Sequence, residues 1–172
     1  KLLSPQPLEK KVSKYRLYKC TWQVGDVYAY RLESEYSKEK GLYGKYIIFQ
    51  KVGETDCWPG HIIPIVVVYR WIGAEIPRME ELRKLEFLNQ IRPVSLIGRT
   101  QEECYHRELV CESEKKIPVT QLILLGNQKP REKTVVKKGR CNCMGWEKTK
   151  INWTIEKETI DLYLAWQEHD NA

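Results

Sequence analysis

Short apolar runs rich in β-branched and aromatic residues constrain the fold of this chain more than any other feature of its sequence. The two strongest runs cover residues 45–52 and 61–71, and a third covers 27–32. Their lengths, and the turn residues between them, are typical of strands. Apolar residues occupy both faces of 45–52, so we expect that strand to be central in its sheet. Because few helical stretches separate these strands, the pattern favours an antiparallel sheet over alternating strands and helices.

Weaker signals place further elements along the chain. We expect a first strand from residue 15, turns at 23–26, 53–56 and 58–60, and a charged loop or helical turn at 33–40. Later strands are expected at 92–97 and 119–125, with a mixed segment at 105–111 between them. Pro64 places the start of the strand over 61–71 at an edge or a bulge.

Two helices complete the predicted fold. Pro77 can open the first, which carries an apolar stripe of Met79, Leu82 and residues 85–87. The second covers about 152–167, because Ile155, Leu162 and Trp166 share one helical face. The predicted class is therefore α+β, mainly β, with a curled antiparallel sheet or small barrel and two flanking helices.

The charge of the chain is concentrated in one segment. The formal net charge is +6, and residues 129–150 hold eight basic and two acidic residues, which accounts for all of it. We expect residues 1–14 to be a linker or arm and 15–172 a single β-rich domain that carries this basic loop. A basic loop can bind nucleic acid, contact an acidic protein, or face only water.

The cellular compartment is predicted from the cysteines and the hydropathy. Six scattered cysteines in 172 residues are not the pattern of a small disulfide-bonded scaffold. The sequence contains neither an apolar run long enough to span a membrane nor a signal-peptide pattern at its start. These features predict reduced thiols and a cytoplasmic location, without membrane association.

Motifs for catalysis are lacking in the sequence. It has no Gly-rich phosphate loop, no GxSxG and no HExxH, and it has only three histidines. Cys57 lies four residues before His61, and such a pair can activate a thiolate, but catalytic cysteines usually meet their histidine through the fold. We therefore predict a protein that is not an enzyme and that needs no cofactor.

A zinc site is the other chemical alternative. Five possible ligands lie in the second half of the chain: Cys104, His106, Cys111, Cys141 and Cys143. Their spacing lacks the CxxC pairs of common zinc knuckles, so we expect no metal.

Aromatic residues suggest a binding surface instead. Tryptophans and tyrosines are dense between residues 22 and 71, where they either fill the core or form a contact surface. Trp146 and Trp153 lie within or beside the basic loop, a combination found in nucleic-acid-binding proteins. The candidate partner-binding residues, taken from two loops, are Trp58, His61, Lys137, Lys138 and Arg140.

One motif carries a family resemblance. The segment Trp22-Gln23-Val24-Gly25-Asp26-Val27-Tyr28-Ala29-Tyr30, followed by Gly41-Leu42-Tyr43-Gly44-Lys45-Tyr46, resembles the bacterial immunity protein 26 family. Residues 8–72 are also similar to uncharacterised Firmicute-type proteins. The resemblance implies a β-rich antidote encoded beside a polymorphic toxin, with that toxin as protein partner. It transfers the motif positions Trp22, Gly25, Asp26, Tyr28, Tyr43, Gly44 and Tyr46, for which we expect mainly structural roles.

Three functional hypotheses remain. The first is a non-enzymatic immunity-type protein that neutralises a cognate toxin by direct binding. The alternative is a nucleic-acid-binding small-barrel module of the PUA-like sort, with the basic loop as its site. A hydrolase or transferase with an unrecognised site is the third, and no nucleophile–base set in the sequence supports it.

Overall fold

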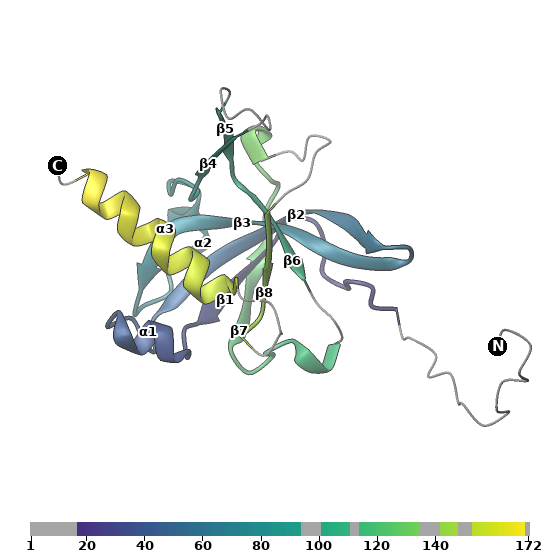
Figure 1. The fold of residues 1–172 in the computed structure, drawn as a ribbon, viewed down its shortest axis with the longest axis horizontal. Coiled ribbons are helices and arrows are strands. Elements are labelled where there is room, and N and C mark those ends of the chain that lie inside the picture. The colour runs from purple at the N-terminus through teal and green to yellow at the C-terminus, as the bar shows by residue number, and fades with distance from the viewer. Residues whose placement is uncertain (1–16, 94–100, 111–113, 135–141, 148–152, 171–172) are drawn as a thin grey trace, which may run out of the picture.

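A six-stranded, mostly antiparallel sheet forms the centre of the computed structural model (Figure 1). The structure describes residues 17–93, 101–110, 114–134, 142–147 and 153–170. The sheet order is β7-β1-β2-β3-β6-β8. Its strands are β1 (Asp26–Arg31), β2 (Tyr46–Trp58), β3 (His61–Gly73), β6 (His106–Val110), β7 (Leu122–Asn127) and β8 (Asn142–Gly145).

The first three strands form the predicted meander, and β7 returns from later in the chain to pair with β1. The last strand, β8, runs parallel to β6. A separate two-stranded sheet consists of β4 (Gln90–Pro93) and β5 (Gln101–Cys104). Two single 3-10 turns cover Glu114–Lys116 and Glu132–Thr134.

Three helices accompany the sheet: α1 (Glu35–Glu39), α2 (Met79–Leu82) and α3 (Ile155–Asp170). The C-terminal helix expected at about 152–167 is α3, and it crosses one face of the sheet (Figure 1). The helix expected after Pro77 is only the four-residue α2. Within the described part of the chain, no helix is both long and apolar enough to cross a membrane.

The prediction of an α+β, mainly β fold is confirmed, but the small barrel is wrong. β7 and β8 lie at opposite ends of the sheet order, so the described sheet is open. A barrel would fill its interior with side chains from its own strands. Here Ile155 and Ile160 of α3 are fully buried in the core instead, so a helix covers part of the apolar face.

Two local predictions are also wrong. Residues 53–56 are not a turn, because β2 continues through them and pairs with β3 as far as Trp58. The register shifts between Lys51 and Gly53, so a bulge accommodates the glycine that suggested the turn. The strand expected from residue 15 is, in its described part, only a bridge between Lys19 and Ile62.

The core lies on both faces of the sheet. Along β1, Tyr30 belongs to one buried cluster, whereas Val27 and Ala29 belong to the other, as alternation along a strand requires. The first cluster includes Trp146 and the α3 residues, and the second includes Leu82 of α2. Packing on both faces explains why the central strands are apolar throughout.

A buried carboxylate ties α3 to the segment after β1. Glu156 is fully buried, and its oxygens accept hydrogen bonds from the Tyr30 hydroxyl (3.1 Å) and from the amides of Glu33 (3.1 Å) and Ser34 (2.9 Å). Ser34 is also the N-cap of α1, where its side chain accepts a hydrogen bond from the Ser37 amide. One side chain thus fixes β1, α1 and α3 relative to one another.

Candidate functional site

A groove of about 400 Å³ opens beside β1 and β7. Its lining comes from the segment before β1, from β1 itself, from the segment that leads into β7, and from the start of β7. The lining residues are Tyr18, Thr21, Trp22, Tyr28, Ile117, Val119, Leu122 and Leu124. Seven of these eight are apolar or aromatic, so the groove can bury apolar surface of a partner.

The turn before β1 places Trp22 and Tyr28 in this groove. Gly25 has a φ of +100°, a backbone conformation that residues with a side chain rarely adopt. A Cβ added at this position would lie 2.7 Å from the Gln128 carbonyl oxygen. Asp26 then accepts hydrogen bonds from the Gln23 amide (2.7 Å) and the Asn127 side chain (2.9 Å). The Gly-Asp pair of the motif therefore ties the turn to the end of β7.

Aromatic packing connects the groove to the core. The ring centroids of Trp22 and Tyr28 are 4.6 Å apart, and Trp22 also lies 6.0 Å from Phe49 and 6.3 Å from Trp146. Phe49 and Trp146 are fully buried, whereas Trp22 and Tyr28 are partly exposed. The floor of the groove is thus an extension of the core, which makes it a preformed surface.

The Lys51 ammonium group binds the backbone of the segment before β1. Lys51 is fully buried, and its Nζ donates to the Trp22 carbonyl oxygen and, at 2.5 Å, to Glu54. A buried lysine needs such partners, because an unpaired charge in the interior is costly. The contact restrains the backbone at Trp22.

The groove is electrically neutral through the physiological pH range. Burial, followed by the charge of Asp26, raises the pKa of Tyr28 from 10.0 to about 12. The phenol therefore stays protonated and can donate a hydrogen bond to a partner.

This pKa predicts a loss of stability in alkali. Between pH 10 and 12 the unfolded chain releases the Tyr28 proton and the folded chain retains it, so the free energy of unfolding falls as pH rises. Urea unfolding at pH 9, 10 and 11 measures how steeply the free energy of unfolding falls with pH. The Tyr28→Phe variant should lose stability less steeply, and an unchanged slope would contradict the assignment.

The rim of the groove exposes apolar side chains. Val119 is 70% exposed and Leu124 is 57% exposed. The twelve residues from Ile117 to Gln128 contain no charged residue, in a chain of which 30% is charged. An exposed apolar rim around an aromatic floor is typical of protein interaction sites.

The other motif positions lie elsewhere. Tyr43 is exposed before β2, with the Lys38 ammonium 5.1 Å from its ring centroid. Gly44 adopts a φ of +79°, and Tyr46 packs against the core cluster on the opposite face from Tyr30. These residues do not line the groove.

The structure gives His61 a place in the interior. The residue is fully buried, and its Nδ1 accepts a hydrogen bond from the Tyr18 amide (3.2 Å). Trp58 pairs with His61 in the ladder between β2 and β3, and its side chain lies outside the described part. Lys137, Lys138 and Arg140 lie in 135–141, outside the described residues.

The Cys57–His61 pair lacks the properties of an activated thiol. Burial, followed by the charge of Glu108, raises the pKa of the Cys57 thiol, whereas a nucleophile requires a lowered one. Since the backbone already occupies Nδ1 of His61, that nitrogen cannot act as a base toward Cys57.

The described zinc-ligand candidates do not converge. Cys104 is buried with its thiol near the His106 carbonyl oxygen, and Cys143 is exposed beside Glu108. Cys111 and Cys141 lie outside the described residues. Among the residues that the structure describes, no group of three or more His, Cys, Asp and Glu side chains could hold a metal ion.

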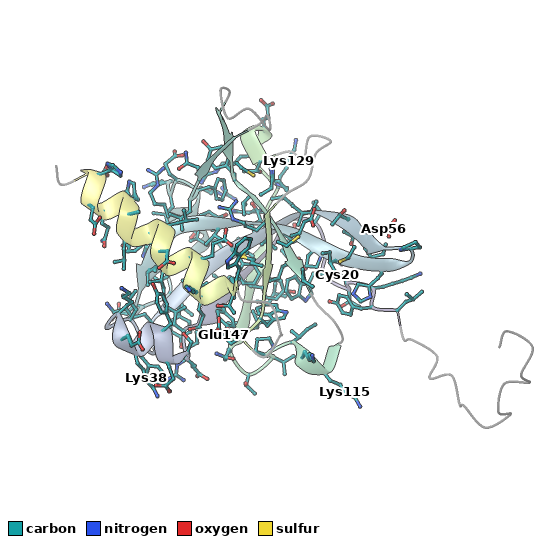
Figure 2. All side chains as sticks on the ribbon, in the orientation of Figure 1. Cys20, Lys38, Asp56, Lys115, Lys129 and Glu147 are labelled. Carbon is teal, nitrogen blue, oxygen red and sulfur yellow. The ribbon has the colours of Figure 1, made fainter. Side chains whose placement is uncertain are left out.

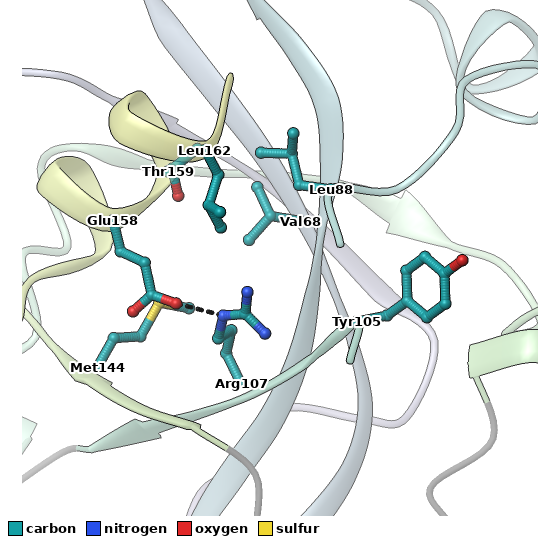
Figure 3. Close-up of a pocket in the computed structure, with 8 residues that line it drawn as sticks. All are labelled: Val68, Leu88, Tyr105, Arg107, Met144, Glu158, Thr159 and Leu162. Atoms are coloured by element: carbon teal, nitrogen blue, oxygen red, sulfur yellow. Dashed lines mark hydrogen bonds and ion pairs between the residues drawn. The ribbon is translucent and has the colours of Figure 1, made fainter. Parts of the chain in front are cut away.

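A second cavity lies under α3 but is too small for a ligand. Figure 3 shows Arg107 and Glu158 directed toward each other across it, joined by an ion pair. Its volume is about 10 Å³, close to that of a single water molecule. The pair therefore joins β6 to α3 and is not a binding site.

Comparison with known proteins found no matching family model, no matching curated protein and no matching solved structure. Of the groove lining, the sequence motif identified Trp22 and Tyr28 but not Ile117, Val119, Leu122 or Leu124. The signal that could have found them is the absence of charge over 117–128.

Proposed function

We propose that this chain is a non-enzymatic binding protein of the immunity type, which neutralises a cognate bacterial toxin by direct contact. The observation that carries this proposal is the preformed aromatic groove beside β7 with its uncharged, exposed rim. Trp22 and Tyr28 are two positions of the motif that resembles immunity protein 26, and both lie in this groove. A protein inhibitor needs such a rigid surface with aromatic contact residues.

The chemistry of the groove supports binding over catalysis. Its only polar side-chain groups are the Thr21, Tyr18 and Tyr28 hydroxyls and the Trp22 indole N–H. The Tyr28 phenol, whose pKa is raised to about 12, stays protonated near neutral pH, and the Thr21 hydroxyl and the Trp22 indole do not titrate there. What the groove offers is apolar area and hydrogen-bond donors for recognition.

The experiment is affinity capture from the native host at moderate salt. Mass spectrometry identifies captured proteins, and the ratio of absorbance at 260 and 280 nm measures nucleic acid in the same eluate. A single protein in one-to-one ratio, encoded beside this chain, supports the proposal. An eluate rich in nucleic acid without a protein partner would instead favour the PUA-like alternative.

One substitution connects this partner to the groove. Val119→Glu places a charge on the apolar rim, and we expect it to weaken partner binding at least tenfold. Since Val119 is 70% exposed, the free energy of unfolding should change by less than about 0.5 kcal/mol. Calorimetric titration with the captured partner measures the loss of affinity.

Tyr43→Glu is the matched control for this variant. It adds the same charge at an exposed aromatic residue outside the groove. Affinity that falls equally in both variants would show that the added charge acts at long range. Affinity that is unchanged in Val119→Glu would place the partner elsewhere.

A further inference from the structure

The outer edge of β7 has no described neighbour. β7 ends the sheet order and pairs only with β1 on its inner side. In an antiparallel ladder, alternate residues direct their backbone N–H and C=O groups away from the neighbouring strand. Part of the β7 backbone can therefore form hydrogen bonds with an added strand.

Among the residues that the structure describes, this edge lacks the usual protection against strand addition. Natural edge strands commonly carry lysine or proline, or are covered by other elements. No charged residue occurs in β7, and Ile123 and Leu124 are 42% and 57% exposed. The one irregularity is a register shift near Gly126 at its C-terminal end, so the start of the strand remains regular.

The groove lies directly beside this edge. Leu124 pairs with Tyr28 and Leu122 with Tyr30, so Leu122 and Leu124 lie on the same face as the aromatic floor. In a strand added to β7, every second side chain would project over this face. Edge and groove together suit one extended segment, with backbone pairing for affinity and the groove for selectivity.

The charged residues near the two ends of β7 indicate which charges the bound segment carries. At one end, residues 114–116 hold two lysines against one glutamate, and at the other, residues 129–134 hold three basic residues against one acidic residue. Figure 2 shows the labelled Lys115 and Lys129 far apart, at the bottom and top of the molecule. An uncharged strand therefore lies between two positive ends.

This charge pattern disfavours a second copy as the occupant. Antiparallel pairing of β7 with itself would bring Lys115 and Lys116 of one copy toward Lys129 and Arg131 of the other. Like charges placed together weaken an interface. A segment with acidic residues at its two ends would instead be attracted at both.

We infer that β7 accepts an extended segment of a partner protein, apolar at its centre and acidic at its ends, as an added antiparallel or parallel strand. This inference rests on the proposed function and names how the partner is held. The Leu124 side chain and the aromatic floor receive the apolar residues of the segment, and Lys115 and Lys129 attract its acidic ends.

The test uses random twelve-residue peptides displayed on phage and selected against the full chain. The Leu124→Lys variant, which places a charge on the edge, serves for depletion, after circular dichroism shows that it is folded. We expect enriched peptides to alternate apolar residues and to carry Asp or Glu at their ends. The best peptide should bind at least tenfold more weakly to Leu124→Lys, with Tyr43→Lys as the control that binds normally.

Two further measurements distinguish strand addition from simple apolar contact. N-methylation of alternate amides along one edge of that peptide should reduce its affinity at least tenfold. The double variant Lys115→Glu/Lys129→Glu should reverse the preference for acidic over basic ends. Full affinity of both N-methylated isomers, enrichment of proline-rich or basic peptides, or no enrichment over Leu124→Lys would overturn the inference.

Failure of strand addition at β7 can be distinguished from failure of the proposed function. A toxin captured equally well by wild type and Leu124→Lys would leave toxin binding standing, but it would place the contact away from β7 and from the groove that Leu124 lines. A dimer of this chain in sedimentation velocity that Leu124→Lys dissociates would show that the occupant is a second copy, and would also overturn the inference.

Discussion

Replacing Trp146 by alanine is expected to lower the free energy of unfolding by about 3–5 kcal/mol, the range for removing a large aromatic side chain from a core. Trp146 is fully buried, and its ring lies 5.5 Å from Tyr30 and 6.3 Å from Trp22, between centroids. The residue follows β8 directly, so its loss also removes a contact between the end of the sheet and the groove floor. Urea unfolding followed by circular dichroism measures the change.

Trp153→Ala is the matched control, since it removes the same side chain from a position that is 67% exposed. We expect this variant to lower the free energy of unfolding by less than about 0.5 kcal/mol. A similar loss of stability in the two variants would show that Trp146 is not the core residue described above. Because Trp22 rests on Trp146, the folded fraction of Trp146→Ala should also bind the partner more weakly.

Replacing Glu156 by alanine is also expected to lower the free energy of unfolding by about 3–5 kcal/mol. The substitution leaves the Tyr30 hydroxyl and the amides of Glu33 and Ser34 without their acceptor. The Tyr30 hydroxyl is buried and the two amides are partly buried, and a buried donor left unsatisfied costs about 1–3 kcal/mol of stability. The effect should be visible as a lower urea midpoint with an unchanged dependence on urea concentration.

Tyr30→Phe provides the comparison, because it removes one of the three donors and keeps the carboxylate. It should cost less than Glu156→Ala, about 1 kcal/mol. In a double-mutant cycle the two substitutions should be non-additive, since they share one hydrogen bond. A loss below about 1 kcal/mol in Glu156→Ala would show that water replaces the carboxylate.

The central strands could be predicted because their apolar pattern is local. The runs at 27–32, 45–52 and 61–71 became β1, β2 and β3, since strands packed on both faces need apolar residues throughout. The turn predicted at 53–56 failed because a bulge at Gly53 lets the strand continue, and pairing with β3 outweighs the local turn preference.

Features that depend on distant pairing were not predictable. The parallel pairing of β8 with β6 joins segments that share no sequence signal. The barrel prediction failed because strand patterns do not show whether a sheet closes, and here α3 covers the face that closure would have enclosed. Likewise, the motif identified Trp22 and Tyr28, but only the return of β7 beside β1 completes their groove.

The partner-binding residues chosen from the sequence illustrate a related difficulty. His61 precedes an apolar run and follows a turn, which suggested an accessible loop position, yet its ring is buried and bonded to the backbone. Exposure depends on what packs against a residue from elsewhere in the chain. For His61 that is the segment around Tyr18, which the sequence alone did not place.

Amide hydrogen exchange of the full chain, with and without the captured partner, tests the central claim most directly. The account predicts that binding protects residues 117–127 and the turn around Trp22, because the partner covers the groove and the edge of β7. Protection confined to the tip of the β2–β3 hairpin around Pro59, with exchange in β7 unchanged, would contradict it.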